Sequence, residues 1–194
     1  MSETISETTS QPAATRQQAN RRLPVWVIIL AFALLAGFLT MIALGLKRAQ
    51  QGPIIVGQTV PPIDLTLFDQ GSVKTTDYAG KVLVLNFWAS WCKPCEQEAA
   101  ELEQAWKEYQ PGEDVVFIGI DYVDTEPEAR AYLQKFGVTY PNGPDLGTRA
   151  SQAFRIRGVP ETYIIDRQGK LAFAQIGPFQ SLEEIKARID PLLK

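Results

Sequence analysis

The chain has 194 residues, of which 45% are hydrophobic and 21% are charged, and its formal net charge is −3. This length fits one globular domain of ordinary size plus accessory segments. The excess of acidic residues lies beyond residue 48, so a basic surface for nucleic acid is absent and nucleic-acid binding is excluded. The chain has two cysteines and no histidine. A Cys/His zinc site needs three or four ligands, so we expect no metal site and no cofactor.

The N-terminal part divides into a polar tail and an apolar segment. Residues 1–24 are rich in Ser, Thr and Gln, which predicts a disordered tail. Residues 25–46 carry no charge, and a helix of this length spans the ~30 Å hydrocarbon core of a bilayer. A cleaved signal peptide, which is the alternative, usually has an apolar region of ~7–15 residues that starts closer to the N-terminus. The sequence therefore predicts a single-pass anchor that contacts the lipid bilayer through residues 25–46.

The charges that flank this apolar segment bear on its orientation in the cell membrane. Arg16, Arg21 and Arg22 precede it, and Lys47 and Arg48 follow it. This small positive excess favours a cytoplasmic N-terminal tail. The C-terminal domain is then expected outside the cytoplasm, where disulfides form and persist.

Beyond a linker over residues 47–57, the pattern of residues 58–194 predicts one domain of strands and helices. Residues 63–67 alternate between apolar and polar, as a half-buried strand does. Residues 82–87 and 115–120 are almost entirely apolar, which is typical of strands buried on both faces of a sheet.

The second half of this domain adds two helices and a hairpin. Thr125 can cap a helix that runs to about Phe136 and ends before Gly137. Ser181 and Glu184 form a capping box that opens a final amphipathic helix. A terminal hairpin is expected from residues 162–165 and 171–176. This order predicts an α/β sandwich with a mixed sheet inside and helices on both faces.

Both cysteines lie in the segment Trp91-Cys92-Lys93-Pro94-Cys95. It follows the strand expected at residues 82–87 and precedes a stretch with helical periodicity, Glu96 to Tyr109. Cys92 is therefore expected at a helix N-terminus, where unpaired N–H groups and the macrodipole favour a thiolate. A disulfide across so short a loop restricts the unfolded chain little, which favours a redox role over a structural one. Pro94 can start the helix and Lys93 adds positive charge, so both are expected to tune the redox poise.

The sequence Phe87-Trp88-Ala89-Ser90-Trp91-Cys92-Lys93-Pro94-Cys95, followed by Gly158-Val159-Pro160-Glu161-Thr162, resembles the thioredoxin superfamily. It is most similar to the membrane-anchored TlpA-like branch of redoxins, which includes the thiol-disulfide reductases of cytochrome c maturation. The resemblance covers about residues 57–194. It also rests on Asn86, where cytosolic thioredoxins carry a buried aspartate, and on Glu98, three residues after Cys95. The interval between Asp121 and Pro160 has room for a strand-helix segment that thioredoxin lacks.

The resemblance implies a thioredoxin-like three-layer sandwich and a role for each residue of the motif. Cys92 would be the exposed nucleophile and Cys95 the buried resolving thiol. Pro160 would be a cis-proline that faces the disulfide, and the backbone of Val159 would pair with a substrate peptide. Trp91 is expected at the rim of this substrate-binding site.

Glu98 and Asn86 each have two interpretations. Residues 95 and 98 share one helix face, so the Glu98 carboxylate could shuttle the proton of Cys95 and raise the pKa of its thiol. The alternative is a surface glutamate, because the remaining glutamates of this helix are expected to form a solvated face. Asn86 either tunes the dithiol or is only a polar residue in the strand.

These observations predict an extracytoplasmic thiol-disulfide oxidoreductase held in the cell membrane. By the resemblance, it reduces disulfides of protein substrates such as apocytochrome c and receives electrons from a thiol-type donor in the membrane. One alternative is a peroxiredoxin-like thiol peroxidase, although the Pro-x-x-x-Thr-x-x-Cys pattern of that class is absent before Cys92. Another is a tethered chaperone module without redox activity.

Overall fold

The computed structural model describes residues 24–49, 53–69 and 71–194. The expected disordered tail lies outside the described residues except for Pro24. The chain divides into two compact units, Met1–Gln51 and Gly52–Lys194, and each is described by itself.

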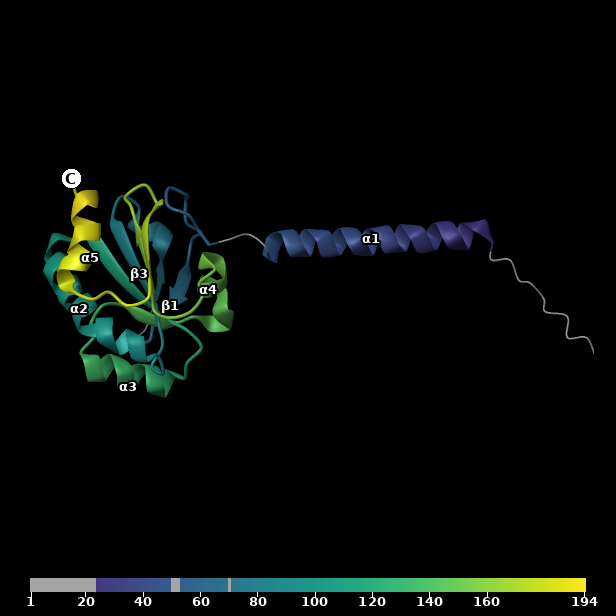
Figure 1. Cartoon of the computed structure of the whole chain (residues 1–194). Coiled ribbons are helices and arrows are strands. Elements are labelled where there is room, and N and C mark those ends of the chain that lie inside the picture. Colours follow the sequence, from purple (N-terminus) through teal and green to yellow (C-terminus); the bar gives the residue numbers. More distant parts are fainter. Residues whose placement is uncertain (1–23, 50–52, 70) are drawn as a thin grey trace, which may run out of the picture. The chain divides into compact units, whose positions relative to one another are not determined.

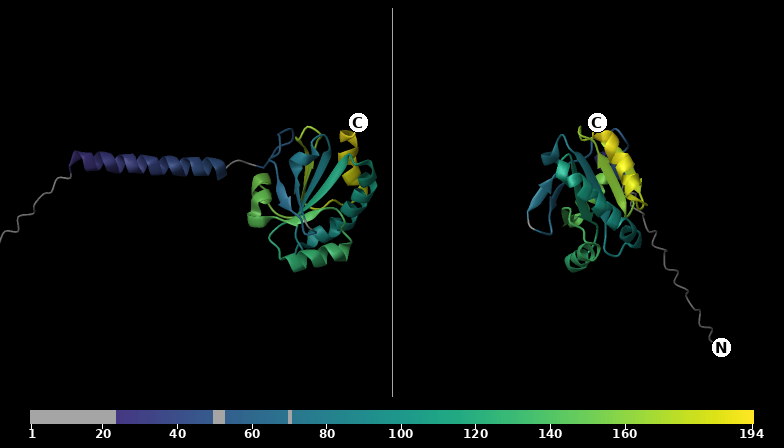
Figure 2. Two further views of the ribbon diagram at one scale, coloured as in Figure 1. Left: turned by 180° about the vertical axis from the view of Figure 1, so that it is seen from behind. Right: turned by 90° about the vertical axis from the view of Figure 1, so that its left-hand side faces the viewer.

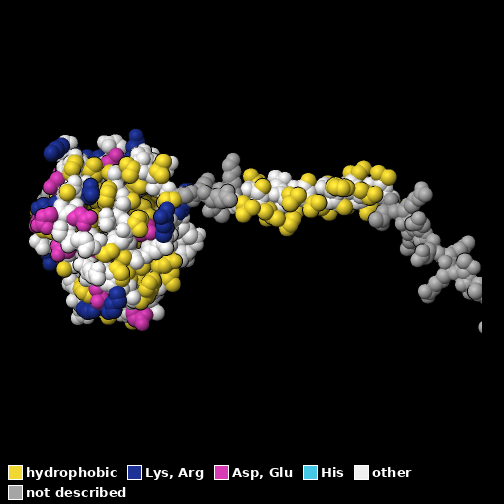
Figure 3. All heavy atoms as spheres, in the orientation of Figure 1, with side chains coloured by type: hydrophobic (Ala, Val, Ile, Leu, Met, Phe, Trp, Pro, Cys, Tyr) yellow, Lys and Arg dark blue, Asp and Glu magenta, His cyan; other side chains and the backbone are white. Residues whose placement is uncertain are grey.

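The first unit contains one long helix, α1 (Val25–Ala49). Its stretch Val25–Leu46 is long and apolar enough to cross a membrane, which agrees with the span predicted from the sequence. The side chains that Figure 3 shows along α1 are almost all apolar. The hydroxyl of Thr40 donates to the carbonyl of Ala36 at 2.7 Å, so this polar group is satisfied within the helix, as a lipid environment requires.

A five-stranded mixed sheet forms the centre of the second unit, as predicted, in the order β5-β4-β3-β6-β7. β3 pairs in parallel with β4, and β4 with β5, whereas β6 and β7 complete the sheet with antiparallel pairing. Every residue of β3 and β4 is buried, which explains their apolar sequences. The strands are β3 (Val82–Trp88), β4 (Val115–Asp121), β5 (Asn142–Pro144), β6 (Glu161–Ile165) and β7 (Leu171–Ile176).

A separate two-stranded sheet precedes the central one. β1 (Asp64–Thr66) was expected, whereas its antiparallel partner β2 (Ser72–Lys74) was not. Val73 is the buried residue of β2, and one apolar position in three gives too little alternation to indicate a strand.

Helices cover both faces of the central sheet, as predicted (Figures 1 and 2). α2 (Lys93–Tyr109) and α5 (Leu182–Ile189) pack on one face. α4 (Arg149–Phe154) and the β1–β2 hairpin pack on the other. α3 (Glu126–Phe136) packs beside the dithiol through Ala129 and Tyr132. Four short 3₁₀ turns complete these elements: Thr75–Tyr78, Gln110–Gly112, Leu146–Thr148 and Asp190–Leu192.

The predicted helix ends agree with the structure in position. Thr125 is the N-cap of α3 and Gly137 follows its last turn in the left-handed conformation that glycine favours. The Thr125 hydroxyl donates to Glu128 rather than accepting from the helix backbone. Ser181 caps α5 by accepting from the amide of Glu184 at 3.2 Å.

Candidate active site

The two cysteines lie where β3 gives way to α2, as the sequence predicts. Cys92 is the N-cap of α2, and its sulfur accepts from the amide of Cys95 at 3.2 Å. Pro94 occupies the first turn of the helix, where its missing N–H is no loss. The cysteines form a disulfide with an S–S distance of 2.05 Å.

The exposure of the two cysteines differs from the expectation. Cys92 is only 3% exposed and Cys95 is 1% exposed, so Cys92 is hardly an exposed residue in the disulfide form. The pair belongs to a buried apolar cluster that includes Trp88 and Ala89, and Val159 from the loop before β6 packs against this cluster. The order of exposure is nevertheless the expected one.

Glu98 is buried at 1% exposure, so the surface interpretation of this residue is wrong. One carboxylate oxygen accepts from the side-chain amide of Asn86 at 2.8 Å, and the other accepts from the backbone amide of Phe179 at 2.9 Å. Asn86 also donates to Thr162 at 3.0 Å, so it links Glu98 to β6. Burial raises the pKa of Glu98 to about 7, although the two hydrogen bonds oppose that shift.

A second buried glutamate of α2 also contradicts the expected solvated face. Glu103 is 5% exposed, and its two oxygens accept from the backbone amide and the hydroxyl of Thr139, both at 2.7 Å. It also pairs with Lys107 at 3.1 Å. Glu103 therefore connects α2 by hydrogen bonds to the segment that leads into β5.

Lys93 forms an ion pair with Glu96, three residues later on the same helix. Its ammonium lies 3.0 Å from the carboxylate of Glu96, which also pairs with Lys135 at 3.2 Å. The hydrogen bonds from Lys93 and then Lys135 lower the pKa of Glu96. The structure thus places the Lys93 charge in an exposed ion pair beside the dithiol, where screening by water weakens it.

The loop before β6 faces the dithiol side of the molecule. The Val159–Pro160 peptide bond is cis, as the resemblance implies. A groove of 280 Å³ runs along this loop and is lined by Pro94, residues 157–161 and residues 176–178. It brings Val159 and Pro160 together with the helix start that carries the cysteines.

Glu161 holds that loop in place, a role that the sequence did not indicate. Its buried carboxylate accepts from the amide of Arg157 at 2.7 Å, from the amide of Gly158 at 3.2 Å and from the hydroxyl of Tyr163 at 2.6 Å. The buried charge is thereby satisfied by three donors. The sequence feature that could have pointed to this role is a glutamate that directly follows proline at the start of an apolar strand.

The two tryptophans around the motif have different positions. Trp91 is 57% exposed, and its indole N–H donates to the carbonyl of Val123 at 3.0 Å. Trp88 is buried in the same apolar cluster as the dithiol and donates to Asn142 at 2.8 Å. Gly119 makes room for this pair, because a Cβ there would lie 1.7 Å from the Asn142 side-chain oxygen.

The sequence analysis did not single out two aspartates near the end of β4. Asp121 ends β4 and is 2% exposed, and Asp124 accepts from the backbone amide of Ser90 at 2.6 Å. Acidic residues directly after a buried strand were the available signal.

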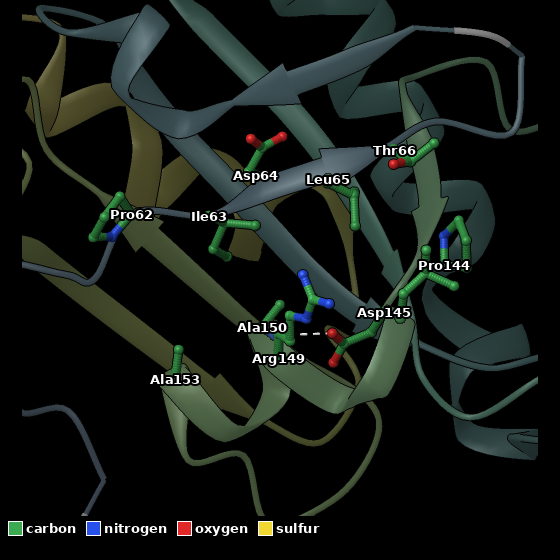
Figure 4. A pocket seen from close by; sticks show the side chains of 11 residues that line it. Pro62, Ile63, Asp64, Leu65, Thr66, Pro144, Asp145, Arg149, Ala150 and Ala153 are labelled. Carbon is green, nitrogen blue, oxygen red and sulfur yellow. Dashed lines mark hydrogen bonds between the residues drawn. The ribbon is translucent and has the colours of Figure 1, made fainter.

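Another hollow, of 230 Å³, lies between β1 and α4 (Figure 4). Asp145 lines it and accepts from the amides of Ala150 and Ser151 in the first turn of α4, both at 2.8 Å. The cysteines do not line this hollow, so it is separate from the dithiol. Within the described ranges, no three Asp, Glu, Cys or His residues are grouped so that they could hold a metal ion.

Comparison with known proteins gives a consistent result. The sequence model of the AhpC/TSA family matches residues 56–174. Thiol-disulfide oxidoreductase ResA from Geobacillus thermodenitrificans is 29% identical over 139 residues, which are 72% of this chain and 79% of that protein. Thiol:disulfide interchange protein DsbE from Allochromatium vinosum is 35% identical over 130 residues, which are 66% of this chain and 70% of that protein.

Solved structures agree with the fold. A DsbE-type thiol:disulfide interchange protein from Chlorobium tepidum superimposes with a TM-score of 0.67 at 25% identity, covering 73% of this chain and 99% of that one. The three-layer arrangement around the dithiol is therefore the thioredoxin-like fold.

Proposed function

Since the chain belongs to the AhpC/TSA family, we propose that Cys92 and Cys95 exchange disulfides with protein substrates, with Cys92 as nucleophile and Cys95 as resolving thiol. The chain is a thiol-disulfide oxidoreductase of the thioredoxin-like type, with a helix suited to anchor it in a membrane. The N-cap position of Cys92 supports its assignment, because helix N–H groups stabilise a thiolate there.

The reaction proceeds in two exchanges. The Cys92 thiolate attacks one sulfur of the substrate disulfide, which forms a mixed disulfide and releases the other substrate sulfur as a thiolate. Cys95 then loses its proton and attacks the sulfur of Cys92. The second substrate sulfur leaves as a thiolate, and the Cys92–Cys95 disulfide forms. Two electrons pass from the protein to the substrate, and a thiol-type donor in the membrane returns them.

Glu98 accepts the proton of Cys95 in this proposal. The observation that carries it is the buried carboxylate, one helical turn after Cys95, which is bonded to Asn86 and to the amide of Phe179. A group with a pKa of about 7 can take up and release a proton at neutral pH. Its negative form also disfavours a Cys95 thiolate, which favours the reducing arrangement.

The groove beside the dithiol is the proposed substrate site. The backbone of Val159 in this groove pairs with the substrate chain, and Pro160 faces the disulfide. The exposed side chain of Trp91, which does not line the groove, forms the rim of the substrate site in this proposal. Lys93, Pro94 and Asn86 tune the redox poise from the helix start and from β3. The proposed substrate is an apocytochrome c with a C-x-x-C-H segment, and the proposed location of residues 53–194 is outside the cytoplasm.

The test is reduction of an oxidised C-x-x-C-H peptide by the full chain in detergent. We expect a midpoint potential nearer to about −270 mV than to about −120 mV. Glu98→Gln should slow the reduction, whereas Glu101→Gln, which makes the same charge change on the same helix, should not. A Cys95→Ser variant in its native membrane should trap the mixed disulfide with the substrate. A potential near −120 mV, or turnover of hydroperoxide instead of the peptide, would overturn the reductase assignment.

A further inference from the structure

Residues 122–124, which follow β4, form hydrogen bonds with residues 88–91, the loop that leads from β3 to Cys92. The amide of Tyr122 donates to the carbonyl of Trp88 at 2.7 Å. The carbonyl of Val123 accepts from the indole of Trp91 at 3.0 Å, and the carboxylate of Asp124 accepts from the amide of Ser90 at 2.6 Å. These contacts hold both ends of the short loop that leads from β3 to Cys92.

Val123 adopts a backbone conformation that its side chain disfavours. Its φ is 48°, and a β-branched residue in the left-handed region is strained. Such a conformation persists only where the surroundings impose it. Val123 and both of its neighbours in the chain bond to the active-site loop.

Asp121 lies behind this segment as a buried carboxyl group that the proposed exchange reaction does not use. It is 2% exposed, and its Oδ1 atom has no hydrogen-bond partner. A hydrogen bond with the side chain of Asp124 is one of the causes that raise the pKa of Asp121, so the two carboxyl groups lie close together. Two carboxyl groups that share one site do not both ionise readily. Both oxygens of Asp124 already accept from backbone amides, one from Ser90 and the other from Thr125, so Asp121 is placed as the donor of the hydrogen bond between the two side chains.

We propose that Asp121 is a positioning residue whose protonated carboxyl group donates to Asp124, so that Asp124 stays on the Ser90 amide and fixes the loop that carries Cys92. This inference rests on the proposed role of Cys92 in disulfide exchange. In this inference, the position of the loop that carries Cys92 depends on the protonation of Asp121. This dependence is separate from the role of Glu98, which bonds to Asn86 of β3.

The surrounding charges support this assignment. Burial raises the pKa of Asp121 from 3.8 to about 8, and the charge and hydrogen bond of Asp124 add to the shift. Asp121 therefore carries its proton at neutral pH and loses it as the pH rises through about 8. Two other acidic residues lie against Asp121: Asp124, whose charge and hydrogen bond act on it, and Asp145, whose backbone amide donates to the Asp121 carbonyl at 2.8 Å.

The first experiment follows the carboxyl ¹³C shift of Asp121 and the amide ¹⁵N shift of Ser90 from pH 5 to pH 9.5. It uses the oxidised full chain in detergent, in which the cysteines do not titrate. A Glu98→Gln background removes the other buried group that titrates in this range. We expect both shifts to change with one midpoint near 8. A midpoint for Asp121 below about 5, or a Ser90 shift that does not follow it, would overturn the proposal.

The second experiment uses Asp121→Asn, because an asparagine amide can donate to Asp124 at every pH. In this variant the amide ¹⁵N shift of Ser90 should no longer change near pH 8 and should stay at its low-pH value. In the reduced proteins, the ratio of wild-type to variant Cys92 alkylation rates should be near one at pH 6 and change several-fold at pH 9.5. A ratio that is constant with pH, or a Ser90 shift that still changes near pH 8 in the variant, would contradict the positioning role. Neither readout needs a protein substrate, so failure of the reductase assignment would remain distinguishable.

Discussion

Replacing Glu98 with glutamine should change how the stability of the domain depends on pH. Burial raises the pKa of Glu98 from an ordinary 4.5 to about 7. A raised folded-state pKa means that the protonated form stabilises the fold fully below pH 4.5, and that this contribution is lost as the pH rises through about 7. At about 1.4 kcal/mol per pKa unit, the loss by pH 8 is about 3 kcal/mol.

Glutamine cannot ionise and resembles the protonated acid in shape, although its amide carries two N–H donors where the acid has one O–H. The Gln variant and the wild type should therefore unfold with similar free energies near pH 5. Above pH 7, the variant should become more stable than the wild type by up to about 3 kcal/mol. The neighbouring donors limit this gain, because the Asn86 amide and the Phe179 amide both need an acceptor that glutamine supplies only once.

The assay is urea unfolding of the oxidised full chain in detergent, followed by tryptophan fluorescence at several pH values from 5 to 9. Asp121 also titrates in this range, but its contribution is common to both proteins and cancels in their difference. Glu101→Gln is the matched control and should show no pH-dependent difference from the wild type. A Glu98→Gln difference that stays constant from pH 5 to pH 9 would refute the reasoning from desolvation.

Three other predictions concern separate features. Reduced Cys92 should alkylate faster than Cys95 at neutral pH, because it is the N-cap of α2, where helix N–H groups stabilise a thiolate. Faster labelling of Cys95, read by peptide mass spectrometry, would reverse the roles. Protease added to right-side-out vesicles should digest residues 53–194 and spare α1, and protection of that domain would place it inside. Gly119→Ala should destabilise the domain by about 1–3 kcal/mol in urea unfolding, because its Cβ would displace Asn142 from Trp88, and an unchanged midpoint would show that this contact is dispensable.

Local pattern was sufficient for the features that depend on neighbouring residues in the chain. The apolar span of α1, the dithiol at the start of α2 and the buried strands β3 and β4 follow from runs of adjacent side chains. The helix ends at Thr125 and Gly137 likewise depend on single residues with strong positional preferences. These features were predictable because each one is decided within about one or two turns of chain.

The environment of the acidic residues was decided only by the tertiary structure. In sequence, nothing separates Glu98 and Glu103 from the other glutamates of the same helix, yet Glu98 accepts from the amide of Phe179, 81 residues away. Asp121 and Glu161 are likewise buried by elements that are distant in sequence. A carboxylate responds to the dielectric and the donors around it, and packing between distant segments supplies both. The sequence by itself therefore determined where the thiols lie, and the fold determined which carboxyl groups can hold a proton beside them.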